Sequence, residues 1–207
     1  MGMFRIEKDE AVGILTSVIV IALSLTLVSS GFGLSPSEFV KTLLIFILTI
    51  GSGFFFHELA HKFVAIRFGH SAKFVPWITG LVLMFVLSIG IAVFNLSLPL
   101  FLAPGAVMIF SNRAISKYEN GIISAAGPIT NIFLAIVFFI FTMLFLLFTN
   151  NIESIALVAF IYGVKINLFL AFFNLLPIFP LDGAKVFAWN KAVWAILIII
   201  SLSGFVL

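Results

Sequence analysis

Two histidines and a glutamate stand at a spacing that suits metal chemistry, because the chain reads H-E-L-A-H from His57 to His61. Each residue of a helix advances by about 100°, so the two histidines lie one turn apart on the same face. Both imidazoles can then reach one ion at the ~2.0–2.1 Å that is typical of zinc–nitrogen bonds. Glu58 lies at the edge of that face, where it can take a proton from a water molecule at the metal. The pattern predicts a zinc centre with Glu58 as its general base.

The same residues have a plainer interpretation, as polar residues at the end of a helix where it meets the cytoplasmic interface. Two features argue against it. The residues before the motif, 43–56, are almost wholly apolar, and a charge at membrane depth is costly enough to be a functional-site candidate by default. A further carboxylate also occurs in a matching place.

That carboxylate is Asp182, which follows an apolar stretch interrupted by two prolines. A catalytic zinc site keeps three protein ligands and leaves one position for water. The chain has no cysteine, so histidine and carboxylate must supply all three, and the other acids lie in the tail or in loops. His57, His61 and Asp182 are therefore the predicted zinc ligands, although Asp182 and Gly183 also fit a plain interfacial turn.

Composition indicates that these residues belong to a membrane protein. Apolar residues make up 63% of the 207 residues and charged residues 9%, against roughly 45–50% and 25% in a soluble globular domain. A water-soluble fold of this size could not cover so much phenylalanine, leucine and isoleucine. The net charge of +3 has an ordinary explanation, because membrane proteins collect lysine and arginine in cytoplasmic loops. No basic run interleaved with aromatic residues suggests a nucleic-acid partner.

Apolar stretches of helical length predict an all-α integral membrane protein with about six transmembrane helices. Crossing the ~30 Å hydrocarbon layer takes about 20 residues of helix. The predicted helices cover residues 11–30, 39–68, 77–98, 122–148, 154–176 and 192–206, with a short apolar piece at 106–110. Residues 1–207 are expected to form a single membrane domain, without a PDZ or CBS domain.

The positive charges predict how this domain lies in the cell membrane. Lysines and arginines gather before the first helix, after the second, and before the helices at 122–148 and 192–206. With these in the cytoplasm only Lys41 lies on the far side, as the positive-inside rule expects. The N-terminus and the zinc site then lie toward the cytoplasm. An even number of crossings is needed between Lys73 and Arg113, so residues 77–110 are expected to form a hairpin or re-entrant insertion.

Three motifs, in this order, resemble the site-2 protease family of intramembrane zinc metalloproteases, and specifically its compact prokaryotic or archaeal members. They are the H-E-x-x-H at His57–His61, a G-P-x-x-N at Gly127–Asn131, and an N-x-x-P…L-D-G at Asn174–Gly183. The resemblance implies that the two histidines and the aspartate bind one zinc ion and that the glutamate activates water. It further implies that Asn131 and Asn174 hold the backbone of the substrate.

The activity that this resemblance implies is that of a zinc-dependent endopeptidase that cuts transmembrane segments of other membrane proteins inside the lipid bilayer. Two alternatives stay open. A transition-metal transporter would also place histidine and aspartate in membrane helices, but with ligands along a path through several of them. A catalytically inactive relative could bind membrane proteins without cutting them, although it would have little use for the general base.

Other polar residues within the apolar stretches receive structural interpretations. An asparagine in hydrocarbon needs hydrogen-bond partners, and Asn167, which has no motif around it, is interpreted as a contact between helices. The same plain interpretation is open for the asparagines of the two motifs. His70 is expected at the interface and not as a metal ligand. Lys165 falls well inside the span 154–176, where it either faces a water-filled cavity or pairs with a polar group.

Overall fold

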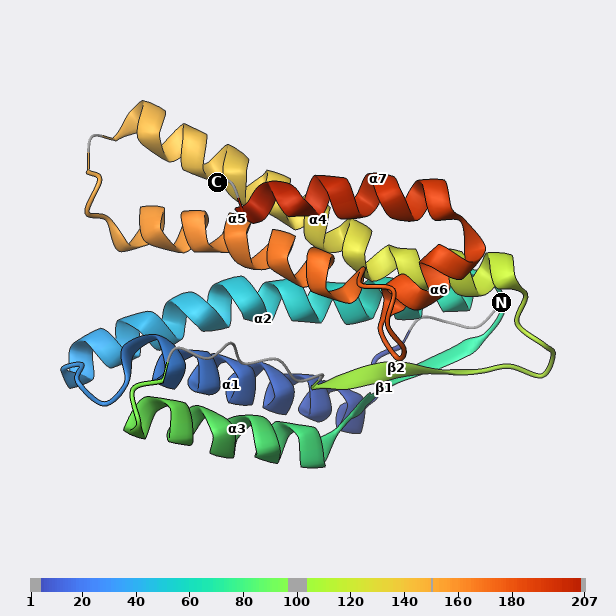
Figure 1. Cartoon of the computed structure of the whole chain (residues 1–207), viewed down its shortest axis with the longest axis horizontal. Helices are drawn as coiled ribbons and strands as arrows, with labels where there is room; N and C mark the ends of the chain where they lie inside the picture. Colours follow the sequence, from blue (N-terminus) through green and yellow to red (C-terminus); the bar gives the residue numbers. More distant parts are fainter. Residues whose placement is uncertain (1–4, 97–103, 150, 206–207) are drawn as a thin grey trace.

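The computed structural model describes residues 5–96, 104–149 and 151–205, and most of its elements run along one long axis (Figure 1). In chain order they are α1 (Lys8–Ser30), α2 (Pro36–Arg67), β1 (Ser71–Pro76), α3 (Ile78–Val93), β2 (Gly105–Phe110), α4 (Lys117–Phe148), α5 (Ile155–Asn174), α6 (Asp182–Trp189) and α7 (Lys191–Leu202), followed by a 3-10 turn at Ser203–Phe205.

Local sequence signals determine where the two longest helices begin. Before α2, the hydroxyl of Ser35 accepts a hydrogen bond from the backbone N–H of Glu38 (3.4 Å), and the Glu38 carboxylate accepts one from the backbone N–H of Ser35 (3.0 Å). This capping box satisfies N–H groups that the first turn of a helix leaves open. Ser116 and Glu119 repeat the arrangement at the start of α4.

Four helices of the described chain are long and apolar enough to cross a membrane, namely α1, α2, α4 and α5. The shorter apolar helices α3 and α7 have 16 and 12 residues. At 1.5 Å per residue they reach about 24 Å and 18 Å, less than the ~30 Å of the hydrocarbon layer. The prediction of a multi-pass, mainly helical membrane protein agrees with this fold, but the count of six spans is not confirmed.

The prediction of an all-α fold is wrong between α2 and α4. Strands β1 and β2 form an antiparallel pair in which Ser71 lies opposite Phe110 and Pro76 opposite Gly105. Exposure alternates along β2, as in a strand with one covered face. The six-residue stretch that contains Val107 and Ile109 is too short for its apolar pattern to separate helix from strand. Because the two strands pair, the two ends of the segment between them lie side by side, and the described part of this segment contains α3.

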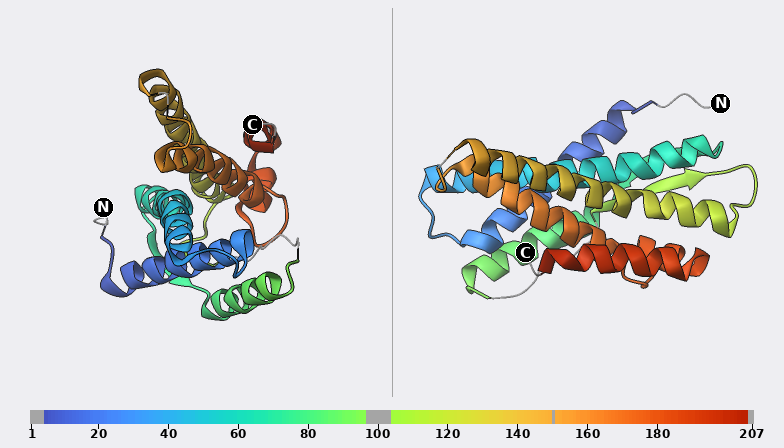
Figure 2. Two further views of the ribbon diagram at one scale, coloured as in Figure 1. Left: turned by 90° about the vertical axis from the view of Figure 1, so that its left-hand side faces the viewer. Right: turned by 90° about the horizontal axis from the view of Figure 1, so that it is seen from above.

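Helix α2 lies at the centre of the molecule. It packs against α1 on one side and against α4 and α5 on the other, and α1 packs in turn against α3; the two views of Figure 2 show these relations. Helix α6 packs against α4, and α7 packs against α5. The end of α2, the start of α4, the two strands and α6 therefore gather at one end of the long axis (Figure 1).

A buried ion pair ties three elements together at this end. Lys62 Nζ on α2 lies 2.5 Å from Glu10 Oε2 on α1. The other oxygen of Glu10 accepts a hydrogen bond from the backbone N–H of Phe74 in β1 (3.0 Å). Breaking a buried pair leaves an uncompensated charge, which is strongly destabilising. The pair therefore holds the sheet against the C-terminal end of α2.

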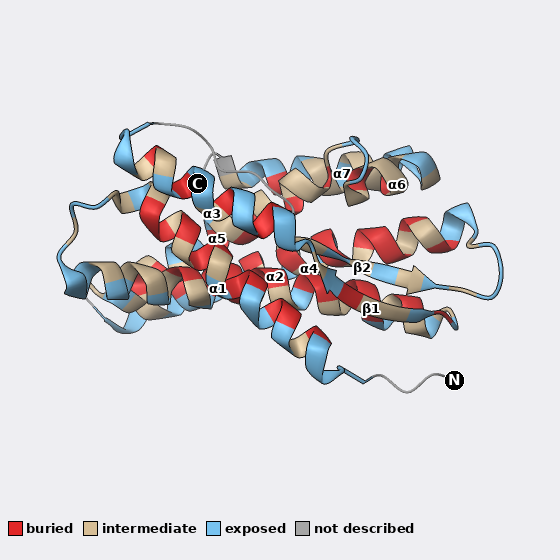
Figure 3. Cartoon of the chain, turned by 90° about the horizontal axis from the view of Figure 1, so that it is seen from below, coloured by how far each residue is buried: buried red, intermediate tan, exposed pale blue. Residues whose placement is uncertain are grey.

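Apolar side chains cover much of the outside of the bundle. Exposed residues occur on every long helix in Figure 3, and they include Leu15 on α1, Leu44 on α2 and Phe133 on α4. Soluble monomers rarely expose contiguous apolar surface of this extent. This surface is suited to contact with lipid.

Candidate metal centre

Three side chains from two helices converge at the centre of the site. The Nε2 atoms of His57 and His61, both on α2, lie 3.0 Å apart. Asp182 is the first residue of α6, and its Oδ2 atom lies 3.4 Å from His57 Nε2 and 2.9 Å from His61 Nε2. Within the described ranges these residues form the one group of three whose ligand atoms could share a metal ion. The structure thus brings together the three residues that the sequence predicted as ligands.

The spacing of these atoms fits a tetrahedral zinc site. At bond lengths of ~2.0–2.1 Å, neighbouring ligand atoms around a tetrahedral zinc ion lie about 3.3–3.4 Å apart. The separations here are 2.9, 3.0 and 3.4 Å. Imidazole and carboxylate are also the donors that zinc takes where thiolate is absent, and three of them leave one position open. The donor set is that of a catalytic zinc site.

Helix α4 orients both imidazoles from behind. His57 Nδ1 lies 2.5 Å from Asn131 Oδ1, and His61 Nδ1 lies 2.7 Å from the backbone oxygen of Ile123. An imidazole that donates its Nδ1–H to such an oxygen presents the lone pair of Nε2 to a metal, with its tautomer and ring orientation fixed. The two contacts therefore aim both Nε2 atoms at the same point.

Asn131 is buried behind His57 and does not reach open space. Its side chain is 0% exposed, and its Nδ2 donates to the backbone oxygen of Gly53 and to Asn167 Oδ1, both at 3.0 Å. With Oδ1 facing His57, every hydrogen-bonding atom of this amide is engaged inside the protein. The structure thus places Asn131 next to a predicted zinc ligand, and the substrate-binding role that the resemblance implied for it stays a prediction.

Asn167 belongs to the same network, although no sequence motif identifies it. Its Oδ1 accepts from Asn131, and its Nδ2 donates to the backbone oxygen of Gly163 (2.9 Å). The hydrogen bond from Asn131 to Asn167 is the contact between helices that the sequence interpretation expected. It also holds the side-chain amide of Asn131, which orients His57. A signal was present: Asn167 lies seven residues, or two helical turns, before Asn174 and therefore on the same side of α5.

Gly127 lets α4 approach the ligands closely. A Cβ atom at this position would lie 2.5 Å from the Nε2 atoms of both His57 and His61, closer than packed atoms tolerate. The point at which the two imidazoles converge is therefore kept clear by the absence of a side chain.

The turn between α5 and α6 carries Asp182 to the histidines. Trp194 Nε1 on α7 donates a hydrogen bond to the backbone oxygen of Leu175 in this turn (2.7 Å). Lys185 Nζ lies 3.5 Å from Asp182 Oδ1, which leaves Oδ2 toward the imidazoles. Asp182 is therefore placed to offer a carboxylate oxygen at the point where the two imidazoles converge.

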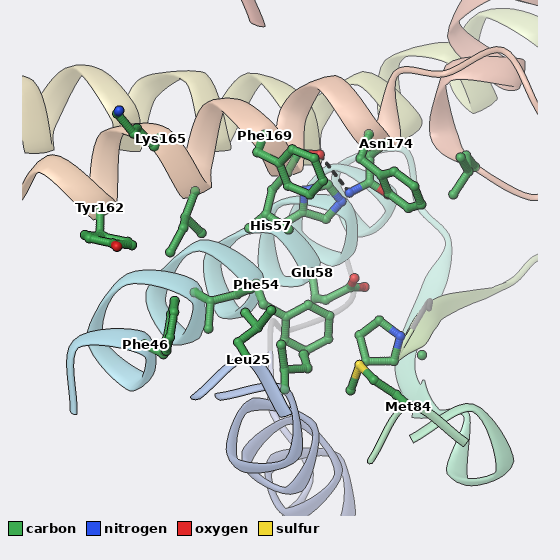
Figure 4. A pocket seen from close by; sticks show the side chains of 18 residues that line it. Leu25, Phe46, Phe54, His57, Glu58, Met84, Tyr162, Lys165, Phe169 and Asn174 are labelled. Atoms are coloured by element: carbon green, nitrogen blue, oxygen red, sulfur yellow. Dashed lines mark hydrogen bonds between the residues drawn. The ribbon is translucent and has the colours of Figure 1, made fainter. Parts of the chain in front are cut away.

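Glu58 lies beside the ligand group without being part of it. Its side chain is buried, and its Oε2 atom has no hydrogen-bond partner within the described residues. Figure 4 shows the carboxyl group directed into open space next to His57. Leaving a buried carboxyl oxygen unpaired costs free energy. Its position suits a group that exchanges a proton with a water molecule in that space.

Two cavities meet at this point. The larger, of about 350 Å³, is lined mainly by apolar side chains of α1, α2, α3 and α5. The smaller, of about 130 Å³, is lined by polar side chains, which include Asp182 and Lys185, and by apolar residues, which include Val107 and Ile109 of β2; it is called the polar cavity below because charged groups border it. His57, Glu58 and Asn174 line both. The site is therefore open toward an apolar space on one side and a polar space on the other.

The remaining polar residues are placed differently. Asn174 borders both cavities, and its Nδ2 donates to the backbone oxygen of Leu170 (3.0 Å). His70 is buried, with its Nε2 atom 3.9 Å from Glu119 Oε1, and it lies outside the group of three potential metal ligands. Lys165 borders the apolar cavity.

Comparison with known proteins gives two relatives. Over 196 residues the chain is 40% identical to the putative zinc metalloprotease MJ0611 of Methanocaldococcus jannaschii, an alignment that covers 95% of this chain and 92% of that protein. Over 160 residues it is 31% identical to the putative zinc metalloprotease YwhC of Bacillus subtilis, with 68% of this chain and 66% of that protein covered. No family model matches the chain, and no solved structure matches it.

Proposed function

The chain belongs to a family of zinc metalloproteases, and on this premise we propose that it is a site-2-type protease that cuts transmembrane segments of other proteins within the bilayer. Four helices of membrane-spanning length support the location. The names of the two relatives and the ligand group support the use of zinc. The partners of the proposed protease are the lipid bilayer and substrates with transmembrane helices.

The observation that most favours this function is the position of Glu58 and the ligand group between two different cavities. The apolar cavity suits the side chains of a transmembrane segment, and the polar cavity suits water. Peptide hydrolysis inside a bilayer needs both reactants at one point, and an intact helix hides its carbonyl groups in its own hydrogen bonds. The substrate must therefore unwind locally beside His57 and Glu58.

His57, His61 and Asp182 would hold the zinc ion. When bound there, zinc supplies polarisation of the scissile carbonyl group and acidification of a water molecule. Glu58 accepts a proton as the water oxygen forms its bond to the carbonyl carbon. As the carbon–nitrogen bond breaks, Glu58 returns that proton to the leaving amine. Asn174, at the border of both cavities, offers its amide oxygen to the backbone of the unwound segment.

The same proposal includes an orientation in the membrane. The lysines and arginines near the C-terminal end of α2, the start of α4 and the sheet lie in the cytoplasm, with the N-terminus, as the positive-inside rule expects. The pairing of Ser71 with Phe110 supports a re-entrant path for the residues between them. On α2, His57 stands ten residues before Arg67, about 15 Å along the helix axis. The zinc site then lies in the cytoplasmic half of the bilayer.

A transition-metal transporter is less well supported. Its ligands would follow a path through the protein, whereas the described residues hold one group of three that could share a metal. Glu58 has no hydrogen-bond partner for Oε2 and is not a ligand in this group, so a transporter would leave it without a role.

Replacing Glu58 with glutamine tests the proposal. The amide keeps the size of the side chain but cannot accept the proton of water at neutral pH, so Glu58→Gln should retain zinc and lose cleavage of a membrane-embedded substrate. Zinc content is measured on the purified protein and cleavage in reconstituted vesicles. Full activity in Glu58→Gln would remove Glu58 as general base and end the proposed mechanism.

A further inference from the structure

Lys165 places a cation in the middle of a membrane-spanning helix. It stands ten residues after Ile155 and nine before Asn174, which is about 15 Å and 14 Å along the axis of α5. Its side chain is exposed, and it forms no hydrogen bond or ion pair with the residues that the structure describes. An ionisable residue at such depth is costly to keep and indicates a function in which it gains a partner.

No acid of the described residues forms an ion pair with Lys165, and the acids in the interior of the bundle are engaged elsewhere. Glu10 pairs with Lys62, and the Asp182 carboxylate lies between the two histidines and Lys185. In the proposed function, Glu58 accepts and returns a proton during hydrolysis. The partner of Lys165 must therefore come from a bound molecule.

The location of Lys165 indicates what that molecule is. Lys165 borders the apolar cavity that leads to His57 and Glu58. In Figure 4 Lys165 lies near Tyr162 at the end of the cavity remote from Asn174, and its amine is directed away from the other lining side chains, at the outer edge of the cavity. The centroids of the Tyr162 and Phe46 rings are 6.1 Å apart in an edge-on contact at this end. A transmembrane segment that enters the cavity past this edge would meet the amine.

We propose that Lys165 is a specificity-determining residue whose ammonium group pairs with a carboxylate inside the substrate's transmembrane segment. The proposal depends on the proposed function for its substrate. Both charges are expensive in hydrocarbon when alone, and each satisfies the other when the segment is bound. Substrates with an aspartate or glutamate at the right depth are then selected over otherwise identical segments.

The geometry also sets where the carboxylate lies. Lys165 and Asn174 are about 14 Å apart along the axis of α5. This distance corresponds to about nine residues of substrate helix at 1.5 Å each, or about four residues of extended chain at 3.3 Å each. Because the segment is unwound near the scissile bond and helical beyond it, the carboxylate lies between four and nine residues from that bond.

The test is a binding measurement that does not depend on cleavage. The full-length Glu58→Gln protein is reconstituted in phosphatidylcholine vesicles, and fluorescence transfer reports binding of a labelled apolar segment. A single aspartate is moved along that segment, and asparagine at each position is the uncharged comparison. At the best position the aspartate segment should bind about tenfold more tightly than the asparagine segment.

Substitutions of Lys165 test whether this residue causes the preference for aspartate over asparagine. Lys165→Met should bring the aspartate-to-asparagine affinity ratio close to one, whereas Lys41→Met, which removes an exposed lysine near the start of α2, should leave the ratio unchanged. Lys165→Glu should transfer the preference to a segment that carries lysine at the same position.

Two results would overturn the proposal. One is an aspartate preference that persists in Lys165→Met. The other is equal binding of all segments together with Lys165-dependent binding of oleate, which would assign the carboxylate to a lipid. A wild-type protein that binds aspartate segments selectively but cuts none of them would instead contradict the proposed function and support the role of Lys165 in recognition.

Discussion

At the scale of single residues, the two motif asparagines have different surroundings. Asn131 is buried with all its hydrogen bonds inside the protein, one of them to His57. Asn174 borders both cavities. A resemblance between sequences assigns both the same role, because a motif records residue types and not what each side chain faces. The structure separates them into one that orients a zinc ligand and one that can meet a substrate.

This difference predicts distinct effects of alanine at the two positions. Asn131→Ala removes the acceptor that fixes His57, so its zinc affinity should fall about 10–100-fold, as for other partners of metal-binding histidines. Asn174→Ala should keep wild-type zinc affinity and lose cleavage rate. Competition with a chromogenic zinc chelator measures the affinity of both variants. Wild-type zinc affinity in Asn131→Ala would contradict the role inferred from the hydrogen bonds.

The ligands themselves were accessible from sequence. Four-residue spacing on a helix decides that His57 and His61 share a face, and a shortage of other acids at membrane depth points to Asp182. The link from Asn167 through Asn131 to His57 was not accessible, because it depends on how closely α4 and α5 pack. That packing is a property of three helices together.

At the scale of the elements, the approach of α4 to α2 shapes the metal centre. Gly127 faces both imidazoles, Ile123 offers its backbone oxygen to His61, and Asn131 faces His57. These residues follow a spacing of four along the chain, so they form a stripe on one side of α4. One side of a single helix thus orients both imidazoles and leaves room for the ion.

Adding one methyl group at Gly127 should disrupt this arrangement. In Gly127→Ala the new Cβ would lie 2.5 Å from both Nε2 atoms, so the helices must separate or the imidazoles must turn away, and zinc content should drop sharply. Gly90→Ala is the matched control, because a Cβ at Gly90 in α3 meets nothing within 4 Å. Metal analysis of the two purified variants gives the comparison. Equal, wild-type zinc content in both would show that α4 does not constrain the site as described.

The helices were easier to anticipate than the strands. Long apolar stretches identify α1, α2, α4 and α5 by length alone, and glycine, proline and polar residues mark their ends. The strands β1 and β2 are six residues each, and their pairing joins segments separated by α3. Helix α6 was also missed, because its eight residues carry Lys185 and follow two prolines, a composition that also suits a loop.

At the scale of the whole molecule, the arrangement solves the problem of bringing water and a hydrophobic peptide to one catalytic group. Helices α1, α2, α3 and α5 line the apolar cavity, and β2, the start of α4 and α6 border the polar one at the end where most lysines and arginines lie. Composition predicted a membrane protein and the loop charges predicted its orientation. The junction of the two cavities required the folded structure, since its lining comes from both ends of the sequence. The single-domain assignment stays a prediction.

The most direct test of the account is to find where the protein cuts. The purified protein, loaded with zinc, is reconstituted with a model substrate that has one apolar transmembrane segment between soluble tags, and the products are weighed by mass spectrometry. The account predicts a cut inside the apolar segment, toward its cytoplasmic end, that stops when a chelator removes zinc and resumes when zinc is restored. A cut confined to the soluble flanks, or one that continues without zinc, would contradict it.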